Sequence, residues 1–445
     1  MFVVSGARVV LPDGERAASI HIRDGIIVRI GARGDAPAGA EALDAGSLVV
    51  SPGIVDTHVH INEPGRAEWE GFVTATRAAA GGGVTTLVDM PLNSVPPTTT
   101  VAGLVAKRQA AAGQIHVDVG FWGGVVPGND LQLTPLVDAG VRGFKCFLVP
   151  SGVDEFPAVD EADLRRILPI IAGCGAPLLV HAEWARGTGL VLEPRDVPDG
   201  IRSRYTAYLA TRPPEAETEA VRVMIRLARE FGARVHIVHV SAAGTVAELA
   251  RARAEGVAIT AETCPHYLTF AAGEVPDGAT AFKCAPPIRD DTQRRALWDG
   301  LRARTLSLVA TDHSPAPAVL KCPGDFFRAW GGVASLELSL AAVWSGARTR
   351  GFGVEDLARW MSAEPAKLAG LAGRKGTLEE GADADVIVWD PDAEFVVKAA
   401  HLRQRHKLTP YDGRTMSGVV TTTFVRGTRV WDQGRVIETP TGRLL

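Results

Sequence analysis

The sequence predicts an α/β protein, in which a (β/α)8 TIM barrel carries a small β-sandwich domain built from both termini. Two observations predict this fold. Strand-like apolar runs alternate with helical stretches through the middle of the 445-residue chain, whereas both ends contain strand-like runs only. We therefore expect three segments: residues 1–50 and 373–445 form the two parts of the sandwich, and residues 51–372 form the barrel.

The two ends of the chain consist of short, apolar strand-like runs. In the first segment these are residues 2–4, 7–11, 19–22 and 26–30, separated by the turn sequences at 12–14 and 24–25. The last segment has similar runs at residues 384–389, 419–425 and 428–431. One small β-domain that combines both ends is the simplest arrangement of these runs.

The central segment contains eight strand-like runs, at residues 53–60, 85–91, 116–123, 143–148, 176–183, 235–241, 258–264 and 306–313. Helical stretches rich in Ala, Leu and Arg lie between them, for example at 67–80, 215–231 and 245–255. Eight β–α alternations predict a parallel barrel. The alternative is a doubly wound open sheet, which is disfavoured because no glycine-rich phosphate loop follows the first run.

The composition is that of an ordinary globular enzyme, with 46% hydrophobic and 22% charged residues and a formal net charge of −4. This charge predicts neither a nucleic-acid nor a membrane partner. The N-terminus lacks the pattern of a signal peptide, so we expect a cytoplasmic protein. The five cysteines are widely spaced without a C-x-x-C motif, which disfavours a disulfide framework or a structural zinc cluster.

Potential metal ligands occur where several central runs end, which is where a barrel places its reactive groups. In the first run, His58 and His60 are two residues apart, so their side chains share one face of a strand. Imidazole is a common ligand of divalent transition metals. The complete candidate set is His58, His60, Lys145, His181, His239 and Asp312.

The remaining histidines are expected to be structural. His236 competes with His239, but the two point to opposite faces of a strand and only His239 reaches its end. His266 follows the seventh run and is expected to orient or pack, and His313 is expected to point away from Asp312.

Lys145 lies between Phe144 and Phe147, where an unpaired ammonium would face a large desolvation cost. Burial lowers the pKa of a lysine, and a neutral amine can react with carbon dioxide to give a carbamate. The two oxygens of that anion could bridge two cations. The alternative is a lysine whose side chain extends to the surface.

Six motifs carry a resemblance that spans essentially the whole chain: PGIVDTHVHINEPGR (52–66), DMPLNS (89–94), GFKCF (143–147), ETCPHYL (262–268), KCAPPIR (283–289) and DHSP (312–315). With them the chain resembles the amidohydrolase superfamily. Within it, the chain is most similar to the cyclic-amide hydrolase branch of dihydroorotases, hydantoinases and allantoinases, and closest to the allantoinases.

The resemblance implies a centre with two divalent metal ions, with zinc expected and cobalt, manganese or nickel as alternatives. It implies that His58, His60 and Asp312 hold one metal, that His181 and His239 hold the other, and that Lys145, as N6-carboxylysine, bridges them. Asp312 would also accept a proton from the attacking water and return it to the leaving nitrogen. The resemblance further implies a small cyclic amide as substrate and a homo-oligomer, expected to be a tetramer.

Departures from the relatives' motifs indicate which ring is opened. Dihydroorotases have an arginine where this chain has Asn62, and they lack the Leu92 that precedes Asn93. Hydantoinases have a tyrosine in the segment that reads Val-Pro-Ser-Gly at 149–152 here. Neutral amides suit the uncharged ureido group of allantoin better than a cationic clamp does. The expected reaction is therefore the opening of allantoin to allantoate in purine (ureide) catabolism.

The residues expected to contact this substrate are Asn62, Asn93 and the backbone of Cys284 and Ala285. The loops at 149–157 and 314–332 are long and punctuated by Gly or Pro, so we expect them to act as lids. Two alternatives stay open: a hydantoinase, dihydropyrimidinase or dihydroorotase, and a non-catalytic barrel scaffold. The scaffold would be expected to lack ligands, and this chain has all six.

Overall fold

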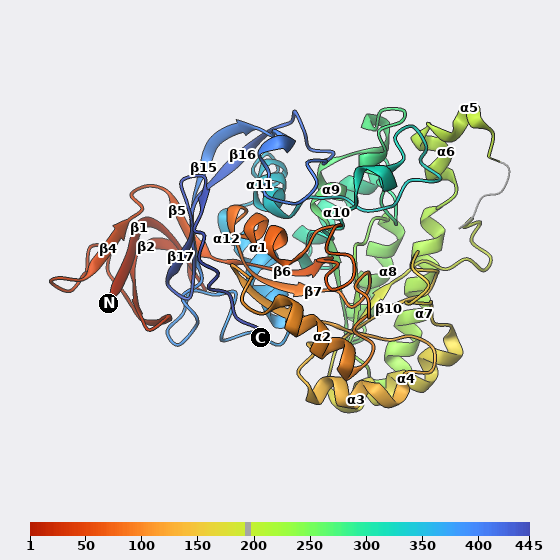
Figure 1. Ribbon diagram of the computed structural model, residues 1–445, viewed down its shortest axis with the longest axis horizontal. Helices are drawn as coiled ribbons and strands as arrows, with labels where there is room; N and C mark the ends of the chain where they lie inside the picture. The colour runs from red at the N-terminus through yellow and green to blue at the C-terminus, as the bar shows by residue number, and fades with distance from the viewer. Residues whose placement is uncertain (192–196) are drawn as a thin grey trace.

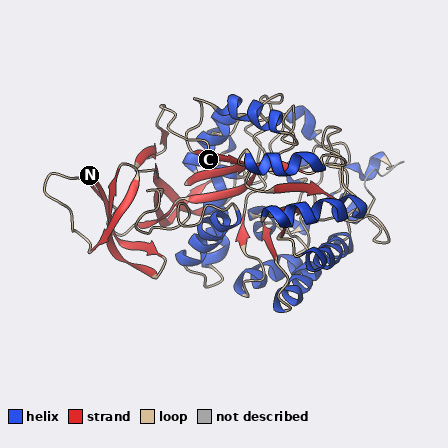
Figure 2. Cartoon of the chain, turned by 90° about the horizontal axis from the view of Figure 1, so that it is seen from below, coloured by secondary structure: helices blue, strands red, loops and turns tan. Residues whose placement is uncertain are grey.

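The computed structural model describes residues 1–191 and 197–445. Two parts follow one another along the longest axis, a helix-covered barrel and a sheet made from the chain ends (Figure 1). A view from below shows helices around the barrel strands, and mainly strands at the N-terminal end of the molecule (Figure 2). This arrangement confirms the predicted α/β barrel fold with a β-domain built from both chain ends.

The barrel is built from two parallel sheets that continue one another. The first contains β6 (Ile54–Val59), β7 (Val84–Asp89) and β8 (Asp118–Phe121); the second contains β9 (Gly123–Gly124), β10 (Phe144–Phe147), β11 (Leu178–His181), β12 (Val235–Ile237), β13 (Ile259–Thr263) and β14 (Leu308–Val309). Because β8 and β9 are the two halves of one strand around Trp122, the described chain contributes the expected eight strand positions. The barrel closes where the amide of His60 donates to the carbonyl of His313 at 2.8 Å.

Several barrel strands end earlier than the sequence predicts. The sixth and eighth runs were expected to continue through His239 and Asp312, but β12 ends at Ile237 and β14 ends at Val309. His239 and Asp312 have φ values of 42° and 48°, a left-handed conformation that no strand can continue. The two side chains are therefore held by the first residues of the βα loops.

The longer helices that accompany the barrel strands are α1 (Phe72–Gly81), α2 (Val101–Ala111), α3 (Asp130–Asp138), α4 (Glu161–Cys174), α7 (Pro214–Phe231), α8 (Ala243–Ala254), α10 (Asp291–Arg302) and α11 (Ser339–Arg348). Shorter ones are α5 (Asp199–Arg202), α6 (Tyr205–Ala210), α9 (Pro265–Thr269), α12 (Val354–Ala358) and α13 (Glu364–Leu368). The predicted helix start at residue 67 is wrong. Gly71, with φ of 92°, precedes the helix and sets its start at Phe72.

The strands of both chain ends belong to one sheet. It contains β1 (Phe2–Leu11), β2 (Gly14–Arg23), β3 (Ile26–Gly31), β4 (Glu41–Asp44), β5 (Val49–Pro52), β15 (Val386–Val396), β16 (Thr415–Val425), β17 (Thr428–Asp432) and β18 (Arg435–Val436). Strand β5 joins the two ends, because it pairs with β1 on one side and β15 on the other. The boundaries at residues 50 and 372 remain a prediction.

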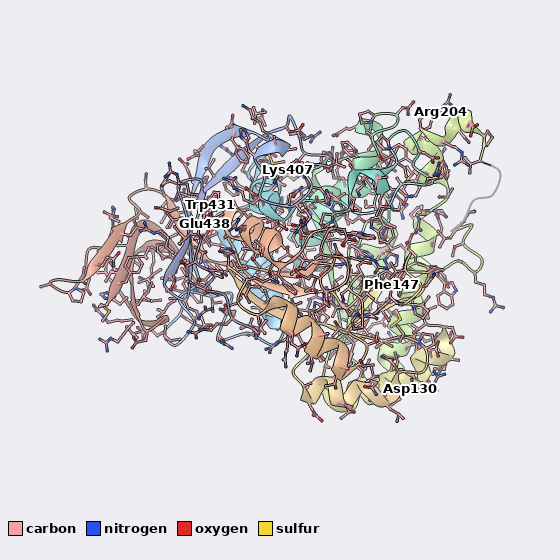
Figure 3. All side chains as sticks on the ribbon, viewed as in Figure 1. Asp130, Phe147, Arg204, Lys407, Trp431 and Glu438 are labelled. Atoms are coloured by element: carbon pink, nitrogen blue, oxygen red, sulfur yellow. The ribbon has the colours of Figure 1, made fainter. Side chains whose placement is uncertain are left out.

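The terminal sheet also packs against the barrel. Trp431 of β17 lies near Gly81 at the end of α1, and Arg77 of α1 forms an ion pair with Glu438 at 2.5 Å (Figure 3). Inside the barrel, a buried cluster unites apolar side chains from several strands, among them Val55, Val88, Leu179 and Leu308. The packed interior leaves the ends of the strands as the place for a site.

Candidate metal centre

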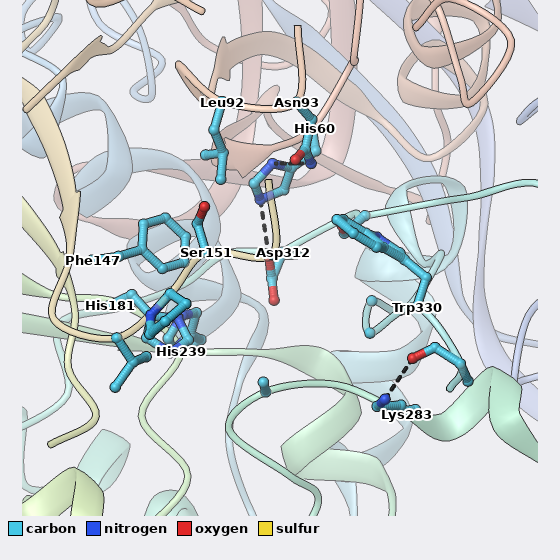
Figure 4. Close-up of a pocket in the computed structure, with 18 of the residues that line it drawn as sticks. His60, Leu92, Asn93, Phe147, Ser151, His181, His239, Lys283, Asp312 and Trp330 are labelled. Carbon is cyan, nitrogen blue, oxygen red and sulfur yellow. Dashed lines mark hydrogen bonds and ion pairs between the residues drawn. The ribbon is translucent and has the colours of Figure 1, made fainter. Parts of the chain in front are cut away.

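A cavity of about 340 Å³ opens at the carboxyl ends of the barrel strands. All six predicted residues line it: His58, His60, Lys145, His181, His239 and Asp312 (Figure 4). Each of them is buried, although they come from five different strands or strand ends. The volume falls in the range that holds small-molecule ligands.

His58, His60 and Asp312 form the first group of potential ligands. Their donor atoms all lie within 4.8 Å of one another, and Asp312 Oδ1 is 3.1 Å from His58 Nε2 and 3.4 Å from His60 Nε2. Burial opposes the charge of Asp312, but His58 and His60 hold the pKa of this carboxyl well below its usual range. Two imidazoles and an ionised carboxylate are a donor set that suits zinc and related cations.

His181 and His239 form the second group. His239 Nε2 lies 2.9 Å from His181 Nδ1, and the His58 and His239 ring centroids are 5.6 Å apart, so the two groups are neighbours. Burial lowers the pKa of both His181 and His239, which favours the neutral imidazole that can bind a metal.

Lys145 of β10 is fully buried in the same cavity. Its Nζ has no hydrogen-bond partner in the described part of the chain and lies 4.9 Å from the centroid of the Phe147 ring. Burial lowers the pKa of Lys145 to about 8, against the charges of Glu262 and Asp312. The alternative of a lysine that extends to the surface is therefore wrong. A buried amine without a partner fits a group that becomes anionic and binds cations.

Two buried glutamates behind the histidines were not predicted as site residues. Glu262 contacts His58 Nδ1 with one oxygen and His236 Nε2, at 3.0 Å, with the other. Glu183 accepts a hydrogen bond from His181 Nε2 at 2.7 Å and also pairs with Arg212. Despite burial, these cationic or hydrogen-bonding neighbours lower the pKa of each glutamate to about 2. In both cases the carboxylate binds one ring nitrogen and leaves the other facing the cavity.

The other histidines lie outside the two groups. His313 Nδ1 accepts hydrogen bonds from the amides of Ser335 and Leu336, so its ring points away from Asp312 as predicted. His266 is buried against Tyr267, with ring centroids 4.2 Å apart, in keeping with a packing role. His236 is also buried, but its contact with Glu262 ties it indirectly to His58.

The predicted substrate residues fall into two sets. Asn93 and Ala285 line the cavity, and Asn93 Nδ2 lies 3.3 Å from His60 Nδ1. Asn62 and Cys284 are buried beside it without being among the lining residues. The carbonyl of Cys284 accepts a hydrogen bond from Tyr208 Oη at 2.7 Å. Direct contacts of Asn62 and Cys284 with a substrate stay a prediction.

Both loops expected to act as lids contribute to the cavity wall. Residues 149–152 line it on one side, and residues 327–332 line it together with Ser314, Leu320 and Cys322. Movement of these loops stays a prediction. None of the described helices combines the length and apolar character needed to cross a membrane.

Comparisons with known proteins agree with this geometry. The amidohydrolase family matches residues 49–430. An allantoinase of Streptomyces avermitilis is 51% identical over 444 residues, which cover 100% of this chain and 98% of that protein. An allantoinase of Arabidopsis thaliana is 42% identical, with 97% and 88% covered.

Among solved structures, the L-hydantoinase (dihydropyrimidinase) of Arthrobacter aurescens aligns with a TM-score of 0.93 and 33% identity. The alignment covers 100% of this chain and 99% of that one. The dihydropyrimidinase of Brevibacillus agri aligns with a TM-score of 0.91 and 29% identity, over 100% and 98% of the two chains.

Proposed function

The chain belongs to the amidohydrolase family, and on this premise we propose that it is an allantoinase, which opens the ring of allantoin by hydrolysis to give allantoate in purine (ureide) catabolism. The observation that carries the proposal is the 51% identity to an allantoinase over the whole chain. The candidate metal centre fits this reaction. Metal ions held there would activate a water molecule that attacks the cyclic amide directly, without a covalent enzyme intermediate.

We propose that the two groups hold two divalent metal ions, with zinc as the metal and cobalt, manganese or nickel as alternatives. His58, His60 and Asp312 would hold one ion, and His181 and His239 the other. Lys145, as N6-carboxylysine, would help to hold both ions. Bound there, the ions would lower the pKa of a water molecule and polarise the amide carbonyl.

Asp312 is the residue best placed to move the proton. Its carboxylate stays ionised beside His58 and His60, so it can accept a proton from the attacking water. The same carboxyl would then donate the proton to the ring nitrogen as the amide bond breaks. A thiolate is not needed, and burial raises the pKa of Cys284 to about 12, which keeps that thiol protonated.

Two alternatives to an allantoinase remain, a non-catalytic scaffold and a hydantoinase. A non-catalytic scaffold is disfavoured, because no candidate ligand is missing from the described residues. A hydantoinase stays as the second candidate function, because the L-hydantoinase of Arthrobacter aurescens has nearly the same fold. Allantoin is itself a hydantoin that carries a ureido group.

The test measures metal content and turnover together. We expect two metal ions per chain after growth with zinc, and faster opening of allantoin than of dihydroorotate or a 5-alkylhydantoin. The variant Asp312→Asn keeps the size of the side chain and is expected to lose turnover at least 100-fold, roughly the contribution of a general base. Faster turnover of dihydroorotate, or no turnover with fewer than two metals, would contradict the proposal.

We further propose a cytoplasmic homotetramer without a nucleic-acid or membrane partner. All five cysteines are free, in keeping with a reducing compartment, and the net charge of −4 offers no general attraction to anionic polymers.

A further inference from the structure

The wall of the cavity away from the metal-ligand candidates carries a lysine, Lys283. Figure 4 shows it on the side opposite His60 and Asn93, with Asp312 between them. Asp312 is the sole acidic residue among the described residues that line the cavity. A cationic side chain on this wall therefore faces a cavity with little negative charge to compensate it.

Lys283 has fewer partners than its three ammonium hydrogens require. Its Nζ donates to the carbonyl of Ala329 and lies 5.2 Å from the centroid of the Tyr208 ring. No carboxylate of the described chain lies within ion-pair distance of it. Burial lowers the pKa of Lys283 to about 8. A largely buried donor with spare hydrogens is stabilised when an acceptor enters the cavity.

The backbone around Lys283 is held on both sides. Gly332 donates its amide hydrogen to the carbonyl of Lys283 at 2.7 Å, and Tyr208 of α6 donates to the next carbonyl, that of Cys284, at 2.7 Å. One bond comes from the loop after β14 and the other from the segment after β11. The lysine is thus positioned before any ligand binds, which reduces the ordering cost of a contact.

We propose that Lys283 is a specificity-determining residue that donates a hydrogen bond to the carbonyl oxygen of the ureido group of allantoin. This inference rests on the proposed function. In allantoin the ureido group is attached to the carbon next to the carbonyl that is attacked. When that carbonyl lies at Asp312, the ureido group extends into the rest of the cavity, where Lys283 is a largely buried cation that forms no ion pair with the described residues. Hydrogen bonds from a charged donor are stronger than neutral ones.

The test compares allantoin with hydantoin, which has the same ring and no ureido group. For Lys283→Met we expect the KM of allantoin to rise about 10-fold or more, the loss of one hydrogen bond from a charged donor. The inhibition constant of hydantoin, measured against allantoin, is expected to change less than about twofold. Lys283→Arg keeps a charged donor and is expected to recover part of the affinity for allantoin.

Arg328→Met is the matched control, because it removes an exposed positive charge from the same cavity wall. We expect this variant to change the KM of allantoin and the inhibition constant of hydantoin by the same factor. Metal content and melting temperature show whether each variant is folded and loaded. The inference is overturned if Lys283→Met weakens the binding of allantoin and hydantoin equally, or if it leaves the KM of allantoin unchanged.

The two proposals fail in different ways. A wild-type protein that leaves allantoin unopened refutes the proposed function, and the inference falls with it. A wild-type protein that opens allantoin, with a Lys283→Met variant that is indistinguishable from it, refutes the inference alone. Preferential opening of a hydantoin with a carboxylate side chain, lost in Lys283→Met, would also overturn it, since Lys283 would then select an anion.

Discussion

At the scale of single residues, the candidate centre is marked by unusual backbone conformations. Asn62, Asn93, His239 and Asp312 have φ values of 67°, 66°, 42° and 48°. Asparagine tolerates this left-handed region, whereas histidine does so at a cost of about 1–3 kcal/mol. Such conformations persist where the surrounding structure holds them. Here they occur where the chain turns after the barrel strands, and Asn93, His239 and Asp312 line one cavity.

The first prediction concerns Glu262, which lies between His58 and His236. The variant Glu262→Gln keeps the shape of the side chain but removes the charge that holds the His58 ring. We expect about 10- to 100-fold weaker binding of one metal ion, the usual effect of losing the partner of a ligating histidine. Metal release to a chelator, followed over its concentration, measures this change independently of turnover.

Glu217→Gln is the control for this variant. Glu217 is similarly buried, but it binds Ser241 and the amide of Ala242 and, among the described residues, forms no hydrogen bond or ion pair with the six candidate ligands. We expect this variant to lower the melting temperature and to leave metal binding unchanged. If both variants weaken metal binding to the same extent, the effect is general destabilisation and Glu262 has no positioning role.

The strand-end positions of the six candidate ligands could be predicted from the sequence, because a barrel brings the ends of its strands to one face. The residues behind them could not. Glu262 is 204 positions from His58, and its role depends on which strands the barrel makes neighbours. The sequence shows Lys283 only as part of the motif at 283–289, because a lysine in a loop has no periodicity that reveals its surroundings.

At the scale of elements, the last residues of the chain act as an additional strand. The amide of Val119 in β8 donates to the carbonyl of Arg443 at 2.9 Å, and Leu445 donates back to Val119 at 2.9 Å. Gly442 donates to Ile115, also at 2.9 Å. Strand β10 pairs with β9 and does not reach β8, the other half of the third barrel strand. The tail therefore supplies hydrogen-bond partners for the backbone groups of β8 on that side.

The second prediction tests this tail strand. Removal of residues 440–445 breaks three backbone hydrogen bonds and leaves buried groups of Val119 unpaired. We expect the free energy of unfolding to fall by about 2–4 kcal/mol. Urea denaturation of the zinc-loaded protein measures it.

Gly442→Ala offers a point substitution at the same place, because a Cβ at Gly442 would lie 2.2 Å from the carbonyl oxygen of Val117. Gly273→Ala is the matched control, since a Cβ at Gly273 meets no atom within 4 Å. Equal stability of the two variants would show that the tail contributes nothing to the barrel.

Most of the barrel was predictable as an element pattern, because its runs are apolar and separated by helical stretches. The tail strand was not, because the sequence ETPTGRLL at 438–445 has too few apolar residues to resemble a strand. Its pairing comes from backbone groups and from Asp118, which accepts a hydrogen bond from the amide of Arg443 at 2.8 Å. The division of the third strand into β8 and β9 likewise has no signal in the run 116–123.

At the scale of the whole molecule, a buried charge cluster joins the barrel to the terminal sheet. Lys375 is fully buried and contacts Asp118 of β8 at 2.7 Å, Asp385 at 2.7 Å and Asp383 at 2.9 Å. Arg426, which follows β16, also pairs with Asp118. One lysine thus compensates the negative charge of carboxylates from both the barrel and the terminal sheet. None of these charged residues is a metal-ligand candidate.

The last prediction follows from this cluster. Lys375→Met is expected to lower the free energy of unfolding by about 3–5 kcal/mol at pH 8, because it leaves buried carboxylates without their cation. Burial and the charge of Asp118 already raise the pKa of Asp385, and loss of Lys375 raises it further. The folded variant therefore binds more protons than the unfolded chain in mild acid, so its stability falls as the pH rises. We expect a smaller loss at pH 5.5 than at pH 8 in urea denaturation, with unchanged metal content. An equal loss at both pH values would show that the defect is a packing defect and that charge compensation does not hold the two parts together.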